Sequence, residues 1–219
     1  AETGEQTREV VWEERRMEER ENVKEMRVES LRQVRQTRQE TWENIERIRE
    51  ENRSLVEQNK LVLKEQLGLL KDQRKAPIVE RIYGNLNRLN DQIVNRLLAK
   101  IDQIEIVLER VKSRTDKAQE AGLDVSGVSE AIAVAEEAIE NARAAAQEQA
   151  EKVYEITIGD EASLRTDIKP VRDQLRSDLE ALRQQVVLAR EAVREAITTL
   201  AQVRGIEGLE ISPSAGETE

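Results

Sequence analysis

The residues best suited to chemistry in this sequence are its carboxylates. Glu136, Glu137 and Glu140 lie within about one helical turn of one another, and Asp173 and Asp178 form a second set. Paired carboxylates can transfer protons or bind a cation. Because the chain has 45 acidic residues, the simpler interpretation of both sets is a solvated helix face.

The composition excludes most other reaction chemistry. The chain has no His and no Cys, so thiol nucleophiles, Ser-His-Asp triads and the common zinc sites are unavailable. Gly159 and Asp160 follow a short apolar run as a phosphate-binding loop would, but no glycine-rich run or Lys-Ser/Thr pair accompanies them. The sequence therefore predicts no catalytic residue, no cofactor and no metal, and we expect the protein not to be an enzyme.

Two tryptophans, Trp12 and Trp42, lie in the most charged part of the chain. Each can cover the aliphatic stems of its neighbours, or each can anchor a partner protein, as buried tryptophans do at interfaces. Both interpretations stay open, and the two residues are candidate partner anchors.

These residues must be positioned by helices. Charged residues make up 37% of the chain and aromatic residues 2%, and only 9 Gly and 3 Pro interrupt it. Such a composition suits narrow seams between long helices. The first helix is expected over 5–75, with a seven-residue frame from Leu31 onward, in which polar Asn residues would fix register and oligomeric state. The candidate self-association seam consists of Leu31, Val34, Ile45, Ile48, Asn52, Leu55, Asn59, Val62 and Leu69.

The rest of the chain predicts an antiparallel three-helix bundle. Pro77 permits either a new helix or a kink in a continuous one. Apolar residues repeat every eleven residues over 78–120 and again in the last helix, which favours straight packing. Residues 153–158 alternate and read as a short extended segment. We thus expect an all-α fold with a coiled-coil-type helix (1–76), a bundle (77–204, with helices over 78–120, 125–152 and 161–204) and an acidic tail (205–219).

Charge and hydropathy also bear on partners. Residues 121–219 hold 20 acidic and 10 basic residues, and the whole chain has a net charge of −10, so we expect no nucleic-acid partner. No apolar run approaches the roughly 18 residues of a transmembrane helix. The first residue, Ala1, fits a mature N-terminus left by a signal peptidase, or a start chosen for expression.

Two stretches carry a resemblance to known sequences. Residues 95–139, with the Gly-x-Asp-Val turn at 122–125, and residues 164–193, beginning Leu-Arg-Thr-Asp, resemble uncharacterised, predicted-secreted helical proteins of candidate-phyla-radiation bacteria. The resemblance covers somewhat over half of the chain. It implies export to the cell surface or envelope, and it implies no activity.

Two functions follow as expectations. The first is a structural protein of the cell envelope that self-associates through its long helix, as a homo-oligomer or filament, with an envelope protein as a further partner. The alternative is a helical binding module, either an exported chaperone-like protein or an adaptor for lipid or cell-wall polymer.

Overall fold

The computed structural model describes residues 2–206, with side chains from residue 24 onward and at 15, 17, 18, 21 and 22. These residues form four helices, α1 (Glu2–Gly68), α2 (Ala76–Glu120), α3 (Ser126–Glu151) and α4 (Leu164–Ala201). Across residues 2–206 there is no strand, which confirms the all-α prediction. Most of the tail predicted at 205–219 lies outside the described residues.

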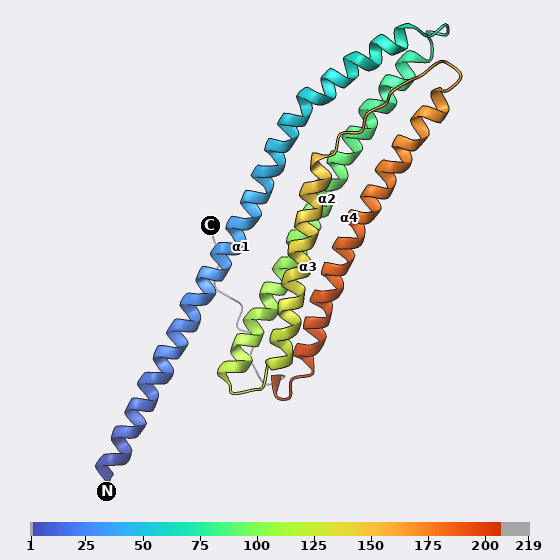
Figure 1. Ribbon diagram of the computed structural model, residues 1–219. Coiled ribbons are helices and arrows are strands. Elements are labelled where there is room, and N and C mark those ends of the chain that lie inside the picture. The colour runs from blue at the N-terminus through green and yellow to red at the C-terminus, as the bar shows by residue number, and fades with distance from the viewer. Residues whose placement is uncertain (1, 207–219) are drawn as a thin grey trace.

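The four helices form an elongated bundle (Figure 1). α2, α3 and α4 contact one another, and we call these three helices together the body. α1 contacts α2 and α3 along its C-terminal part, whereas its N-terminal part extends past the α2–α3 turn. With 67 residues, α1 is about 100 Å long.

The sequence left open whether the chain is continuous at Pro77, and the structure contains two separate helices there. Residues 69–75 reverse the chain, so α1 and α2 run antiparallel (Figure 1). Pro77 lies in the first turn of α2, where a missing backbone N–H costs nothing because no helical partner exists for it.

Part of the seven-residue frame predicted for α1 leaves its buried face. A straight α-helix drifts by about 20° per seven residues, so a seven-residue row rotates away from a flat neighbour. Along one such row the exposed fraction rises from 5% at Thr41 and 7% at Ile48 to 41%, 54% and 87% at Leu55, Val62 and Leu69. The face toward the body repeats every eleven residues instead, as Ile45, Val56 and Leu67 and as Ile48, Asn59 and Leu70.

The connection between α3 and α4 is extended, as predicted for 153–158. Tyr154, Ile156 and Ile158 are buried and the residues between them are not. The segment runs along α2 beyond the end of α3 (Figure 1). The core therefore has two parts, one lined by α3 and the other by this segment together with the C-terminal end of α1.

Candidate functional site

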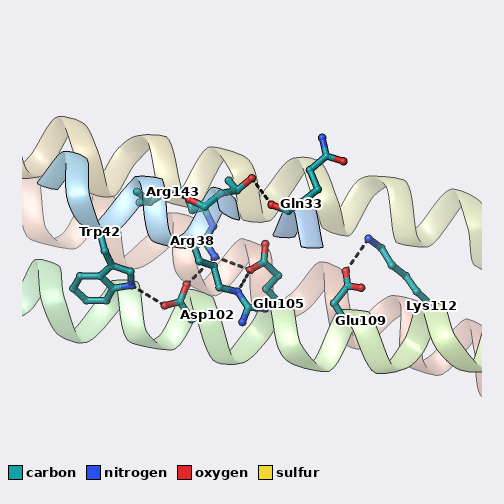
Figure 2. Close-up of polar contacts among 10 residues, drawn as sticks. Gln33, Arg38, Trp42, Asp102, Glu105, Glu109, Lys112 and Arg143 are labelled. Carbon is teal, nitrogen blue, oxygen red and sulfur yellow. Dashed lines mark hydrogen bonds and ion pairs between the residues drawn. The ribbon is translucent and has the colours of Figure 1, made fainter. Parts of the chain in front are cut away.

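The densest cluster of buried charge lies where α1 packs on α2 and α3 (Figure 2). Arg143 of α3 is 5% exposed, and its Nη2 donates to Asp102 Oδ1 and Glu105 Oε2, each at 2.7 Å. From α1, Arg38 donates to the same Glu105 oxygen, and Trp42 Nε1 donates to Asp102 Oδ2 at 3.0 Å. We call these five residues the central cluster.

The central cluster balances two cations against two carboxylates. Such a buried network adds little net stability, because desolvation offsets the attraction, but breaking it is costly. Within the described residues, Arg143 Nε and Nη1 have no hydrogen-bond partner. The cluster therefore acts mainly on geometry: α1 can satisfy both carboxylates in only one register along α2 and α3.

The carboxylates that could have done chemistry have structural contacts or face solvent. Glu136 pairs with Lys112, and Asp178 accepts hydrogen bonds from the Tyr154 hydroxyl at 2.8 Å and from Lys152 Nζ at 3.1 Å. Glu137, Glu140 and Asp173 are exposed. Among the residues with described side chains, no group of three or more carboxylates is arranged to hold a metal ion.

The polar residues of the predicted seam are used within the chain. Asn52 and Asn59 of the seam, and Gln66 seven residues further along α1, all bond the stretch that ends α3 and leads toward α4. The bonds are Asn52 Nδ2 to the Ala150 carbonyl at 2.9 Å, Asn59 Nδ2 to Glu155 Oε1 at 2.6 Å, and the Ile158 N–H to Gln66 Oε1 at 3.0 Å. In the structure these residues fix the register of α1 against the rest of its own chain.

The remaining seam residues do not share a face, which corrects the single seam predicted from the sequence. Ile45 and Ile48 lie in the core formed with the body. Leu31 and Val34 are half-buried. Leu55 and Val62 are exposed on a flank of α1, and Leu69 is exposed just after α1 ends at Gly68; we call these three the outer row.

Of the two predicted partner anchors, the structure describes the side chain of Trp42 and not that of Trp12. Trp42 is half-buried against the chain's own core and hydrogen-bonds Asp102, so its anchoring contact is made within the chain. The side chain of Trp12 lies outside the described residues.

One signal was missed in the sequence: a basic residue every eleven positions on α1. Arg27, Arg38 and Arg49 face α2 in turn. Arg49 Nε lies 3.6 Å from Asp91 Oδ1 and its Nη2 donates to the Asp91 carbonyl at 3.2 Å, while Arg27 bonds Ser113. Burial raises the pKa of Asp91, and the nearby Arg49 opposes that shift. This basic row, like the apolar one, fits a helix with an eleven-residue repeat.

The comparisons with known proteins add no assignment. No family model, curated protein or solved structure matches the chain. In the described part of the chain, no helix is both long and apolar enough to cross a membrane.

Proposed function

We propose that this is a non-enzymatic structural protein that self-associates through α1, as an oligomer or filament. The observation that carries the proposal is the outer row. Leu55 and Val62 lie seven residues apart on the flank of α1 beside its buried face, Leu69 follows at the same interval just after the helix ends, and all three are exposed. A seven-residue apolar period is the signature of a seam between two supercoiled helices.

A second copy of the chain is the partner that fits the outer row. Two copies related by a two-fold axis would present the same row to each other, which is how most homodimers form. Leu61 is also exposed, but it points about 100° away from Val62 around the helix and does not belong to the row. The row spans only about 20 Å, at 1.5 Å per residue, and we expect association that depends strongly on concentration.

The projecting part of α1 supports the same proposal. Met17, Met26 and Val28 are each more than half exposed and lie toward the free end of the helix. In this view α1 is a coiled-coil-type helix and α2, α3 and α4 are an elongated three-helix bundle that carries it. The resemblance described above supports a location at the cell surface or envelope, with an envelope protein as a further partner of the assembly.

Light scattering on a sizing column over a hundredfold range of concentration tests the proposal. We expect the mass of the native chain to rise with concentration, and Val62→Glu to lower the mass reached at each concentration. Val134→Glu is the matched control, because Val134 is a similarly exposed valine on α3, outside the row. A native chain that stays monomeric throughout, or equal effects of the two substitutions, would overturn the proposal and favour the binding-module alternative.

A further inference from the structure

The turn between α1 and α2 is built from residues that favour helix. Residues 69–75 read Leu-Leu-Lys-Asp-Gln-Arg-Lys and contain neither Gly nor Pro. Leu, Lys, Gln and Arg are among the best helix formers. The α2–α3 turn is different, because Gly122 adopts a φ of +79°, a conformation that most residues avoid. The first turn has no such residue, and its local bonds come from side chains: Asp72 Oδ1 accepts the Arg74 N–H at 3.1 Å, and Gln73 Nε2 donates to the Leu70 carbonyl at 2.6 Å.

A single side chain from elsewhere in the fold holds the first turn closed. Glu161, just before α4, accepts the N–H groups of Lys71 at 2.9 Å and Asp72 at 3.1 Å through Oε2. Its Oε1 lies 2.7 Å from Lys75 Nζ, and this bond with Lys75 is the main reason that the pKa of Glu161 is lowered. Three bonds to one carboxylate thus fix the reversal of the chain.

Pro77 also favours the closed turn. In the first turn of α2 it is well placed, whereas inside a continuous helix it would remove a backbone hydrogen bond and clash with the preceding turn. The turn is therefore balanced between residue types that favour a continuous helix and the contacts of Glu161, Pro77, Asp72 and Gln73, which favour the closed turn.

We propose that residues 69–75 are a hinge and that two copies of the chain exchange α1 through it. When the hinge straightens, α1 continues along the axis of α2 and leaves its own body. Because α1 and α2 are antiparallel in one chain, a two-fold axis at the hinge brings each α1 onto the body of the other copy in its native direction. Such an exchange is a low-cost route to a dimer, since each contact is remade between chains.

The contacts of α1 favour the body of a second copy of this chain as the surface on which an exchanged α1 packs. The central cluster and the bonds from Asn52, Asn59 and Gln66 join side chains whose spacing matches only this body. The inference rests on the proposed self-association and adds how two copies join. It does not use the outer row, which remains exposed after exchange.

Zero-length crosslinking of the native chain tests the exchange. Lys64 Nζ of α1 lies 3.7 Å from Glu80 Oε2 of α2, so a carbodiimide can couple them. Unlabelled and ¹⁵N-labelled protein are incubated together at high concentration, coupled and digested. A crosslinked peptide with an unlabelled Lys64 segment and a ¹⁵N-labelled Glu80 segment shows that α1 of one copy packs on α2 of another. The Lys112–Glu136 pair joins α2 to α3, and its peptides serve as the internal control because they must keep one isotope.

We expect mixed-isotope Lys64–Glu80 peptides to form, to increase several-fold with Pro77→Ala or Glu161→Gln, and to decrease with Gln73→Pro. Val62→Glu should leave them unchanged. If light scattering detects dimers while the Lys64–Glu80 peptides stay unmixed in all variants, the exchange is wrong and the proposed self-association stands. If every variant remains monomeric, both are wrong.

Discussion

Arg143 and Glu105 form a charge pair, 2.7 Å between Nη2 and Oε2, that is buried between α3 and α2. Glu105 also accepts a hydrogen bond from Arg38 of α1, so one carboxylate joins three helices. Residues such as Glu105, which contact α1 and α3 together, control how α1 packs on the body. Their substitution should weaken this packing as well as local stability.

Replacing Arg143 should be strongly destabilising. Arg143→Ala leaves Asp102 and Glu105 without their shared cation, and we expect a loss of about 3–5 kcal/mol in the free energy of unfolding. Arg190→Ala is the control, because Arg190 is exposed and pairs only with its neighbour Glu191; its loss should be within about 0.5 kcal/mol. Chemical denaturation followed by circular dichroism measures both. Similar effects of the two substitutions would contradict a structural role for the central cluster.

The eleven-residue face of α1 can be tested with two members of the predicted seam. Ile45→Ala removes a fully buried side chain and should cost about 2–5 kcal/mol. Val62→Ala, on the outer row, should change the free energy of unfolding by about 0.5 kcal/mol or less when measured at low concentration. Comparable losses at the two positions would mean that the seven-residue frame describes the packing after all.

Much of the fold follows from the sequence because the signals are local. Gly122 ends α2 with a positive φ, and its neighbour Leu123 returns an N–H to the Ala118 carbonyl at 3.0 Å. The alternation around Tyr154 predicts an extended segment. These features depend on a few consecutive residues and needed no knowledge of their partners.

The packing of α1 could not be predicted in the same way. Its inner face mixes apolar residues with Thr41, Asn52 and Asn59, so hydrophobicity alone gives two competing periods. The two asparagines are satisfied by groups about 100 residues away in the sequence, such as the Ala150 carbonyl for Asn52. The central cluster was missed for the same reason, because Arg38 and Glu105 are 67 residues apart.

The two tyrosines should resist ionisation. Burial, aided by the charges of Glu155 and Glu57, raises the pKa of Tyr83 to about 12. Burial likewise raises the pKa of Tyr154. Because the chain has only these two tyrosines, we expect almost no tyrosinate absorbance from the native protein at about pH 10, where a model tyrosine is half ionised. A half-titration near pH 10 without unfolding would show that both hydroxyls are solvated.

The same shift predicts a loss of stability in alkali. A raised pKa in the folded state contributes stability that is complete below the unfolded pKa of about 10 and is lost as pH rises toward 12. Tyr83→Phe removes this contribution, so the native chain should lose up to about 3 kcal/mol more than the variant over that interval. Unfolding curves at several pH values measure the difference, and parallel pH profiles would exclude the effect.

Acid should weaken the start of α4. The pKa of Asp167 is lowered, first by the hydrogen bond from the Ser163 hydroxyl at 2.6 Å and then by that from the Gly159 N–H at 3.0 Å. A lowered pKa contributes stability above the unfolded value of about 3.9, and that stability is lost as pH falls through the folded value. We expect the native chain to be more stable than Asp167→Asn at neutral pH and to approach it below about pH 4. A difference that persists in strong acid would point to lost packing instead of lost charge.

The eleven-residue repeat also gives the molecule a unit of length. Three turns of helix carry α1 or α2 forward by about 16 Å and return each face nearly to its starting direction, so blocks of eleven could be added to or removed from paired helices without turning their inner faces outward. The extended connection after Ile156 covers the same distance with about five residues. Related rods of different lengths would then be expected to differ by elevens in the helices and by four or six residues in this connection, because an odd number would invert its alternation of buried and exposed side chains.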